Sequence, residues 1–390
     1  MTSILMLSEC YHPIRNGVVT SLDTFSTSLK SRGHKVTILA SNHRDKNLYF
    51  DDQNMVYRLP ALTLPLKTNY PLPIPLIDNK LSNVIFDNDF DLVHSQSIMT
   101  MGRLGVRVSK QLKIPLVLTY HTLIEEYHQY FPIFPPKLVV SVARDISYRY
   151  CMKANHIIVP GPHVYDKLKK YGITTDMTVI PTGINLREID AASPEDLALH
   201  GIPKGAKIIV YVGRVAPEKN IFKLFETYNL LAKKMDNVHL LIVGGGPLYD
   251  NCVNDRESSP YKDRIHFTNY LPKQQVLKIF KAADIMLFTS NSETQGLVFA
   301  ESMAANTPIV ATDSNAANAI IENGVNGILC DNNEEDLAAK CYELLNNDSL
   351  YKTIQENAQK RAKDYDDELM TDRLLEVYEK TLLSYGSKLV

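Results

Sequence analysis

Two carboxylates lie eight positions apart at the end of a predicted strand: Glu293 follows the apolar run Ile285–Phe288, and Glu301 falls in the helix expected from about Leu297. At 1.5 Å per helical residue they are separated by roughly 10–12 Å, too far for a carboxylate pair acting on one glycosidic bond, which needs about 5–10 Å. The spacing suits two contacts to one elongated ligand, with the helix N-terminus between them available to phosphate. The alternative is that Glu301 is a surface residue of the helix and that Glu293 is a neighbour of the helix cap.

Two cations, Arg214 and Lys219, lie five positions apart in a loop that follows the predicted strand 208–212. Fixed at the carboxyl edge of a sheet, such a pair can hold a diphosphate and stabilise the charge that develops as it leaves. The alternative is that both cations pair with surface acids. Gly213 lies in the same loop, and Gly245 lies in a glycine run after the next strand, where backbone can approach a ligand closely. A glycine run after a strand is weak evidence alone.

The first half of the chain has a glycine and two histidines at the ends of predicted strands. Gly17 lies between a strand and a helix, where its backbone can come close to a phosphate or a sugar. His121 follows the strand Leu116–Thr119, a position better suited to a substrate than to core packing, and His94 at another strand end competes for that role. The Asp-x-Asp pattern at 89–91 precedes its strand, at the wrong edge of the sheet, so we predict no metal site.

The elements that position these residues follow from an alternation of short apolar runs and amphipathic helical stretches, which is typical of βαβ units with parallel sheets. The pattern starts twice, at 3–7 and at 208–212, each time with a strand and a glycine-bearing turn. We therefore predict an α/β protein with two doubly wound, Rossmann-like domains, whose ligand loops face a shared cleft. The boundary is expected near 181–190, and 71–75 is expected to be an extended loop.

Length and composition limit the class of protein. The chain has 390 residues, enough for two domains, and its 45% hydrophobic and 22% charged residues are ordinary for a globular protein. Its five cysteines form no CxxC pair, which favours a reducing compartment over a disulfide framework or a zinc site. The first residues resemble a strand and not a signal peptide, and no apolar run reaches the ~18 residues of a membrane span. We expect a cytosolic protein, or one that sits on a membrane without crossing it.

The formal charge of -2 hides an asymmetry between the two halves. Residues 1–184 hold 20 Lys and Arg against 14 Asp and Glu, whereas the rest of the chain is acidic. Most of the excess lies in 137–170, where seven basic residues accompany two acidic ones. The asymmetry favours an anionic partner for the first half, with a chance excess on a solvated face as the alternative. Nucleic acid is disfavoured, because the sequence has no long basic stripe with interleaved aromatics.

Taken together, these residues resemble the retaining glycosyltransferases of family 4, which have the two-domain GT-B fold. The matching pieces span nearly the whole chain in the expected order: Gly213-Arg214 with Glu218-Lys219, 244–247, Ala283-Asp284, and 292–298 leading to Glu301 and Pro308. The resemblance implies that a first domain, 1–185, holds the acceptor and that a second, 186–365, holds a nucleotide-sugar donor. It also implies that the last helix, 366–390, returns to the first domain.

The resemblance gives a role to each candidate residue. Arg214 and Lys219 would grip the donor diphosphate, and Glu301 would bind the ribose hydroxyls. Glu293 would contact the transferred sugar, with backbone around Gly296 and Leu297 beside it. Gly17 would approach the phosphate from the other domain, and His121 would lie next to the sugar and the reaction centre. The catalytic set is thus His121, Glu293, Arg214 and Lys219, and further donor-binding residues are Gly17, Gly213, Gly245, Gly296, Leu297 and Glu301.

The acceptor is suggested by residues 120–130, which look like the corresponding stretch of bacterial diacylglycerol glucosyltransferases. Just after it, 136–154 carries Leu138, Val142 and Ile146 at helical spacing. A basic helix with an apolar stripe can lie on an anionic membrane surface, and the alternative is that the stripe faces the protein's own core. The cations expected to face lipid are Lys137, Arg144, Arg149 and Lys153.

The expected function is retaining transfer of glucose from UDP-glucose to the hydroxyl of a diacylglycerol, giving an α-glucolipid at the inner face of the cell membrane, with no cofactor. A nucleoside diphosphate needs little protonation to leave, so charge stabilisation dominates over general-acid catalysis. A soluble or polyprenyl-linked sugar acceptor, or GDP-mannose as donor, would keep the enzyme class. A GT-B nucleotide-sugar epimerase is a different class, which the Glu293/Glu301 spacing and the Arg214/Lys219 loop disfavour.

Overall fold

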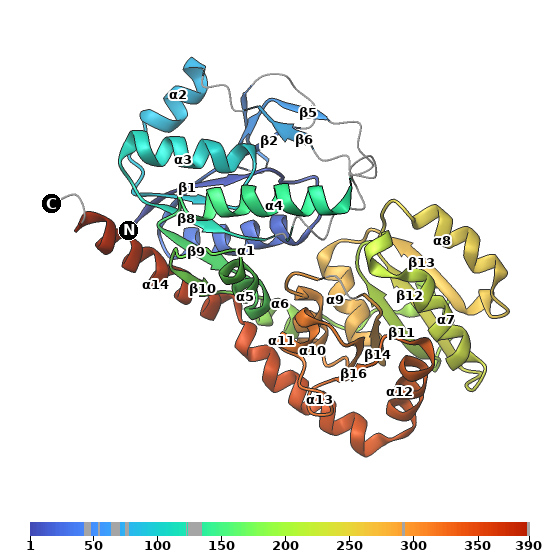
Figure 1. Ribbon diagram of the computed structural model, residues 1–390. Helices are drawn as coiled ribbons and strands as arrows, with labels where there is room; N and C mark the ends of the chain where they lie inside the picture. Colours follow the sequence, from blue (N-terminus) through green and yellow to red (C-terminus); the bar gives the residue numbers. More distant parts are fainter. Residues whose placement is uncertain are drawn as a thin grey trace. The chain divides into compact units, whose positions relative to one another are not determined.

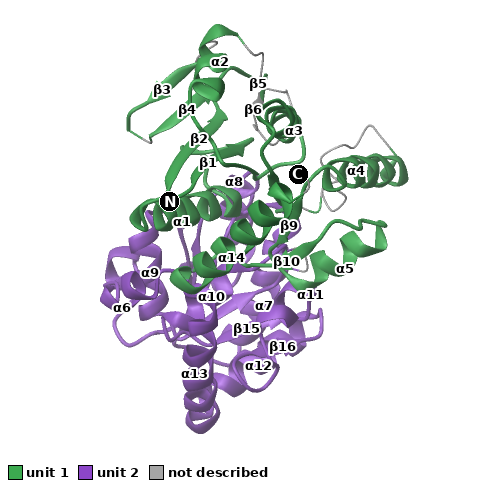
Figure 2. Cartoon of the chain, turned by 90° about the vertical axis from the view of Figure 1, so that its left-hand side faces the viewer, with its two compact units in different colours: residues 1–183, 367–390 green, residues 184–366 purple. Residues whose placement is uncertain are grey.

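The computed structural model describes residues 1–42, 48–53, 55–63, 71–74, 78–121, 123, 135–290 and 293–387. The chain divides into two compact units, which Figure 2 shows in different colours: unit 1 is Met1–Gly183 with Asp367–Val390, and unit 2 is Ile184–Asp366. The bounds of unit 2 lie two residues before and one residue after those expected from the sequence. Each unit is built on its own sheet with helices on both faces (Figure 1).

Unit 1 contains an eight-stranded sheet in the order β10-β9-β8-β7-β1-β2-β4-β3, with parallel pairs throughout apart from antiparallel β3–β4. The strand order changes direction at β1, since β2 lies on one side of it and β7 on the other. Ligand loops of doubly wound sheets lie at the carboxyl ends of the strands at such a point. The strands are β1 (Ser3–Ser8), β2 (Lys35–Ser41), β3 (Tyr49–Asp51), β4 (Val56–Leu59), β7 (Leu92–Ser95), β8 (Leu116–Thr119), β9 (His156–Val159) and β10 (Met177–Val179).

Side chains of β1 alternate between two hydrophobic cores, one on each face of the sheet. Leu5 and Leu7 belong to a core that also contains buried residues of α2, α3, α4 and α5, whereas Ile4 and Met6 belong to one with α1 and α14. The sheet is therefore covered on both sides, which explains why its central strands are continuous apolar runs. The helices are α1 (Gly17–Ser31), α2 (Asn79–Phe86), α3 (Thr100–Leu112), α4 (Pro136–Cys151), α5 (Pro162–Lys170) and α14 (Asp367–Gly386).

Helix α14 belongs to unit 1 although it follows unit 2 in the sequence. Its buried face, with Leu374 and Tyr378 among its residues, packs in the core that contains α1. Arg32, which caps the end of α1, donates to the Glu368 carboxylate at 2.8 Å and also pairs with Asp372. Apolar burial and these ion pairs together hold α14 on unit 1.

The expectation of an extended loop at 71–75 is wrong for residues 71–73, which form a strand, and residue 75 lies outside the described residues. β6 (Pro71–Pro73) pairs antiparallel with β5 (Ala61–Thr63) in a separate two-stranded sheet. Proline lacks the N–H that a central strand needs, but in a two-stranded ribbon each strand is an edge. The prolines therefore exclude a central strand here and are compatible with an edge strand of a two-stranded sheet.

Unit 2 contains a six-stranded parallel sheet in the order β13-β12-β11-β14-β15-β16. Within the unit this is the order 3-2-1-4-5-6 of a doubly wound dinucleotide-binding fold. The order reverses between β11 and β14, which are direct neighbours, so the loops that follow these two strands meet at the topological switch point. The strands are β11 (Lys207–Val212), β12 (Val238–Val243), β13 (Ile265–Asn269), β14 (Ile285–Phe288), β15 (Ile309–Thr312) and β16 (Ile328–Cys330).

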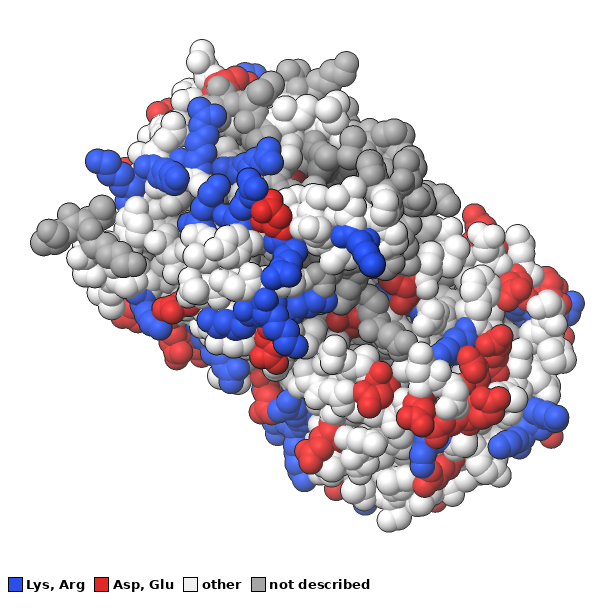
Figure 3. All heavy atoms as spheres, viewed as in Figure 1, with Lys and Arg blue, Asp and Glu red and all other residues white. Residues whose placement is uncertain are grey.

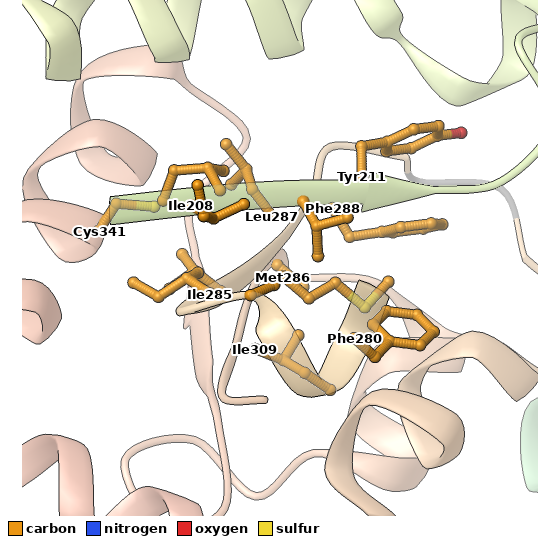
Figure 4. Packing of buried hydrophobic residues seen from close by; sticks show 14 of the residues in the cluster. Ile208, Tyr211, Phe280, Ile285, Met286, Leu287, Phe288, Ile309 and Cys341 are labelled. Carbon is orange, nitrogen blue, oxygen red and sulfur yellow. The ribbon is translucent and has the colours of Figure 1, made fainter. Parts of the chain in front are cut away.

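The core of unit 2 continues up to the switch point through three aromatic rings in contact. Figure 4 shows Tyr211 and Phe288 with their rings nearly parallel, 5.9 Å apart between centroids. Phe299 meets Phe288 edge to face at 4.9 Å. These contacts fix the ends of β11 and β14 and the start of α10. The helices are α6 (Leu186–Ala191), α7 (Ile221–Ala232), α8 (Tyr249–Asp255), α9 (Lys273–Ala282), α10 (Leu297–Ala304), α11 (Asn315–Ile320), α12 (Glu334–Asn346) and α13 (Asp348–Ala362).

Candidate active site

The loops after β11 and β14 are hydrogen-bonded to each other at the switch point of unit 2. Thr289 Oγ1 lies 3.3 Å from the carbonyl oxygen of Lys219 and 3.1 Å from that of Asn220, and Ser290 Oγ donates to the carbonyl of Glu218 at 2.8 Å. Segments 70 positions apart in the sequence are thereby joined side by side. The loop that carries Arg214 and Lys219 and the loop that carries Glu293 therefore lie side by side.

Lys219 and Glu293 form an ion pair within this arrangement. The distance from Lys219 Nζ to Glu293 Oε1 is 2.5 Å, and the two side chains are 13% and 22% exposed. The ammonium also lies 5.9 Å from the centroid of the Phe288 ring, close enough for a cation–π attraction. Lys219 therefore pairs with an acid of the predicted site. Both groups can exchange this pair for a phosphate and a hydroxyl of a ligand.

Arg214 lies at the same edge of the sheet with a looser acidic partner. Its Nη1 is 3.8 Å from Oε1 of Glu218, whose side chain is only 8% exposed. The hydroxyl of Tyr211 donates to the Arg214 carbonyl at 3.1 Å. Burial, reinforced by the nearby charges of Glu293 and Glu218, raises the pKa of Tyr211 well above its usual range, so that its hydroxyl stays protonated. The Arg214 loop is held by a neutral donor underneath it.

The glycines of the predicted donor site are required first by the protein's own packing. A Cβ at Gly245 would lie 2.3 Å from Oδ1 of Asn269, and one at Gly213 would lie 2.8 Å from the hydroxyl of Tyr211. Gly296 has φ of 72° directly before α10 and, as a glycine, has no side chain that could cap the helix that begins at Leu297. In the first turn of α10 the Phe299 N–H donates to the Gly296 carbonyl at 2.9 Å, and the N–H groups before it point toward the helix start, where an acceptor such as phosphate can bind.

Glu301 lies on α10 with one acid and one cation nearby. Burial raises the pKa of its carboxyl; Glu188 raises it further, and Lys273 opposes both effects. Lys273 lies 4.0 Å from the Glu188 carboxylate. Among the described residues the Glu301 carboxylate has no hydrogen-bond or ion-pair partner. A half-buried carboxyl of this kind can accept hydrogen bonds from ligand hydroxyls.

In unit 1 the N-terminus of α1 leaves space in front of Gly17. Asn16 caps the helix, with Oδ1 accepting from the Val19 N–H at 2.9 Å. A Cβ placed on Gly17 would meet no atom of the described residues within 4 Å. Gly17 therefore differs from Gly213 and Gly245, because the packing of the described residues does not require it. A ligand that approaches this helix N-terminus would account for it.

The structure separates the two candidate histidines. His94 is 1% exposed, with Nδ1 2.6 Å from the Tyr378 hydroxyl and Nε2 2.7 Å from Thr119 Oγ1. His121 is only half-buried, and its Nε2 lies 2.7 Å from Oε1 of Gln96. Burial lowers the pKa of His94 to about 3 and that of His121 to about 4. His94 is thus a structural histidine. Gln96, which orients His121, was not identified from the sequence because no local pattern marks it.

Helix α4 exposes one part of the predicted apolar stripe and buries the other. Leu138 and Val142 are 51% and 49% exposed, and Tyr148 is also exposed. Ile146 instead packs against the core of unit 1, beside the buried Ser147. The prediction of a solvent-facing stripe therefore holds for the first half of the helix and is wrong for Ile146. Val140 adds a further exposed apolar side chain to this first half.

The predicted lipid-facing cations Lys137, Arg144, Arg149 and Lys153 are all exposed. Arg149 pairs with Asp145 at 2.8 Å, and both remain largely exposed. Figure 3 shows Lys and Arg gathered over the part of unit 1 that carries α3, α4 and α5, with few acidic residues among them. The exposed basic residues of these three helices and of the turn after α4 are Arg103, Arg107, Lys110, Lys137, Arg144, Arg149, Lys153, Lys169 and Lys170. This surface can attract an anionic partner.

Two further observations concern metals and membranes. Among the described residues, no three His, Cys, Asp or Glu side chains form a group that could hold a metal ion. Asp91 of the Asp-x-Asp pattern instead accepts a hydrogen bond from the Ser3 N–H at 2.8 Å. Within the same part of the chain, no helix combines the length and apolar character needed to cross a bilayer.

The fold of the two units is that of a known class of proteins. Sucrose-phosphate synthase from Thermosynechococcus elongatus has a similar structure, with a TM-score of 0.78 at 17% sequence identity over 98% of this chain and 100% of that chain. Two doubly wound parallel sheets of this kind define the GT-B fold, which confirms the fold class expected from the sequence.

Sequence comparison identifies the family. The Glycosyltransferase Family 4 model matches residues 15–188, and the Glycosyl transferases group 1 model matches 193–361. An alpha-monoglucosyldiacylglycerol synthase of Acholeplasma laidlawii is 30% identical over 374 residues, 92% of each chain, and that of Streptococcus pneumoniae is 28% identical over 92% of this chain and 84% of that one. A GDP-mannose-dependent alpha-mannosyltransferase of Corynebacterium glutamicum is 26% identical over 96% and 88%. The chain belongs to glycosyltransferase family 4 and is a hexosyltransferase.

Proposed function

We propose that the protein transfers glucose from UDP-glucose to the free hydroxyl of a diacylglycerol, with retention of the anomeric configuration, at the inner face of the cell membrane. Two relatives with matching length are named alpha-monoglucosyldiacylglycerol synthases, which supports glucose and diacylglycerol as the substrates. The observation that carries the lipid acceptor is the exposed apolar and basic face of α4.

The donor side of the proposal rests on unit 2. Arg214 and Lys219, at the carboxyl ends of the strands, would hold the diphosphate and stabilise its charge as it leaves. Glu293 would contact the sugar, and Glu301 would accept hydrogen bonds from the ribose hydroxyls. The proposal involves no metal or other cofactor, since two cations and the N-terminus of α10 supply positive potential for the phosphates.

The chemical step would occur on one face of the sugar. The acceptor hydroxyl oxygen forms a bond to the anomeric carbon on the face from which the phosphate leaves. The bond between that carbon and the phosphate oxygen breaks, and the hydroxyl proton passes to the departing phosphate oxygen, so that UDP is released. No side chain is needed as a nucleophile on the opposite face. The product is an α-glucoside, and a β-glucoside would refute this step.

The acceptor side rests on α4 and its neighbours. Burying two half-exposed side chains such as Leu138 and Val142 in lipid contributes ~2 kcal/mol, and each nearby cation adds about 1 kcal/mol on an anionic surface. With four predicted cations the sum is enough for reversible binding to a membrane surface. Such binding would bring the protein to an acceptor that is confined to the bilayer.

The test is UDP release from UDP-glucose, UDP-galactose and GDP-mannose, with and without diacylglycerol in mixed micelles that contain anionic lipid. We expect release from UDP-glucose that rises only with diacylglycerol. Turnover of any donor that ignores diacylglycerol would refute the lipid acceptor. Preference for GDP-mannose would refute the donor and leave the enzyme class unchanged.

A variant of α4 tests the lipid surface directly. Leu138→Ser with Val142→Ser removes exposed apolar surface without touching the core, so we expect the affinity for anionic vesicles to fall about 30-fold, the equivalent of ~2 kcal/mol. Leu199→Ser is the matched control, because Leu199 is 76% exposed and lies in unit 2. Equal vesicle binding by the double variant and the control would show that α4 does not face lipid.

A further inference from the structure

A continuous chain of buried polar side chains runs from α14 to His121 within unit 1. His94 Nδ1 lies 2.6 Å from the Tyr378 hydroxyl, and His94 Nε2 lies 2.7 Å from Thr119 Oγ1 and 3.2 Å from Gln96 Nε2. Gln96 Oε1 lies 2.7 Å from His121 Nε2. Tyr378, His94, Gln96 and Thr119 are all at most 5% exposed. Because bulk water does not reach these groups, each contact needs a donor that faces an acceptor.

The amide of Gln96 sets the direction of the chain, since its two ends have opposite roles. The amide is placed with its nitrogen 3.2 Å from His94 Nε2, and in this orientation the nitrogen donates and His94 Nε2 accepts. A neutral imidazole accepts at one nitrogen and donates at the other, which places the His94 proton on Nδ1, where it is donated to the Tyr378 oxygen. The oxygen of Gln96 only accepts, so the His121 proton lies on Nε2.

Both imidazoles are neutral near pH 7, because burial lowers their pKa values to about 3 for His94 and about 4 for His121. A charge on His121 would also repel one on His94, which opposes protonation of the pair. A neutral His121 that carries its proton on Nε2 has a lone pair on Nδ1.

We propose that Gln96 is a positioning residue that locks His121 in the Nε2–H tautomer, so that His121 Nδ1 accepts a hydrogen bond from a substrate hydroxyl. The site then favours a group that can donate a hydrogen, and disfavours a phosphate oxygen, which only accepts. Tyr378 and His94 hold the Gln96 amide in the required orientation. The hydroxyl ligand rests on the proposed function, whereas the tautomer rests on the hydrogen-bond chain alone.

The tautomer is measurable in the full-length protein labelled with 15N-histidine. Long-range 1H–15N correlation spectra at pH 7 distinguish a protonated from a bare ring nitrogen, and a His121→Asn variant assigns the signals. We expect His121 to be protonated at Nε2 and bare at Nδ1. Protonation at Nδ1 would overturn the proposal, because it would mean that the Gln96 amide is reversed. Comparable amounts of both tautomers would also overturn it, because Gln96 would then not fix the tautomer of His121.

Substrate titrations identify the source of the hydroxyl. A change in the His121 Nδ1 signal with UDP-glucose but not with UDP alone would assign it to the sugar. A change that needs diacylglycerol micelles, and not empty micelles, would assign it to the acceptor. No change with either would overturn the acceptor role of Nδ1.

Gln96→Met tests the positioning role, because it fills the same space without either polar end. We expect both His121 tautomers to appear and kcat to fall about tenfold, the size of one lost hydrogen bond at the reaction centre. Gln355→Met is the matched control, since Gln355 is half-buried and its Nε2 donates to the Asn306 carbonyl in unit 2 through a solvent-exposed hydrogen bond. A single Nε2–H tautomer in Gln96→Met would overturn the proposal. If the unmodified protein has the Nε2–H tautomer and Gln96→Met has both tautomers, but no nucleotide sugar is turned over, only the proposed function is refuted.

Discussion

Removing the carboxylate of Glu293 should have opposite effects on UDP binding and on sugar transfer. Lys219 Nζ lies 2.5 Å from this carboxylate. If Lys219 holds the donor diphosphate, UDP competes with Glu293 for the ammonium. Glu293→Gln keeps the shape of the side chain and removes the competing charge, so UDP binds more tightly. The same variant would lose the proposed charged contact to the sugar, so we expect transfer to slow.

The size of both effects follows from the burial of the pair. Exposed ion pairs contribute 0.2–1 kcal/mol, and since both of these side chains are less than a quarter exposed we take ~1 kcal/mol. That free energy is about a fivefold decrease in the Kd of UDP. A hydrogen bond to a charged group contributes ~1.5–3 kcal/mol, so kcat/KM with UDP-glucose should fall about 10- to 150-fold.

Calorimetric titration with UDP and steady-state transfer assays measure the two quantities on the same sample. Glu257→Gln is the control, because it removes a carboxylate that pairs with Lys262 at 3.0 Å on an exposed part of unit 2. We expect both quantities to be unchanged in this control. A weaker or unchanged affinity of Glu293→Gln for UDP would refute the idea that Lys219 is shared between the carboxylate and the diphosphate.

Three further predictions address unit 1. Gly17→Ala should leave the melting temperature unchanged or slightly raised, since its methyl group has room at the start of a helix. It should lower kcat/KM at least tenfold, because the methyl group occupies the space in front of that helix. An unchanged kcat/KM would place the ligand elsewhere. Because unfolded histidines titrate near 6.5 and burial lowers the pKa values of His94 and His121 to about 3 and about 4, the unfolded chain binds more protons between pH 6.5 and 4. The free energy of unfolding should therefore fall with decreasing pH, by up to ~1.4 kcal/mol per unit for each histidine, and urea titrations with a flat pH profile would contradict this. Arg32→Ala should lower the free energy of unfolding by ~0.5–1 kcal/mol through weaker docking of α14, and equal urea midpoints would mean that apolar burial alone holds the helix.

The central strands could be predicted from the sequence because burial on both faces leaves an uninterrupted apolar run. Ile285–Phe288 was located at its observed bounds for this reason. Edge strands lack that signal: β3 has three residues, of which Tyr49 and Phe50 are exposed, so no periodicity marks it. The stripe on α4 had the correct spacing, but spacing alone does not tell which half of a helix extends beyond the core.

Strand ends and residue types were enough to select Lys219 and Glu293, but not to pair them. Their ion pair depends on β11 and β14 being neighbours, which is a property of the strand order and not of either local sequence. Gln96 shows the same limit. A single glutamine after a strand has no local signal, and its amide reaches His121 only because β7 and β8 are adjacent.

The structure also connects the proposed lipid surface to the loop of His121 through one buried hydrogen bond. Tyr120 is 2% exposed, and its hydroxyl lies 2.7 Å from Ser147 Oγ on α4. Ser147 Oγ donates to the Ala143 carbonyl, so Tyr120 is the donor in its own bond to Ser147. The residue directly before His121 is therefore fixed to the helix that exposes Leu138 and Val142.

Tyr120→Phe removes this bond and keeps the buried ring. We expect the sugar-transfer step, which would need α4 and the His121 loop in a fixed relative position, to lose ~1 kcal/mol of transition-state stabilisation. This corresponds to about a fivefold lower kcat with diacylglycerol micelles. The Kd of UDP should not change, because the candidate nucleotide loops lie in unit 2 and Tyr120 lies in unit 1. An effect on UDP binding of the same size would show a general loss of folding, and full activity would show that α4 and the His121 loop act independently. A selective loss of transfer would mean that α4 also helps to position the loop of His121.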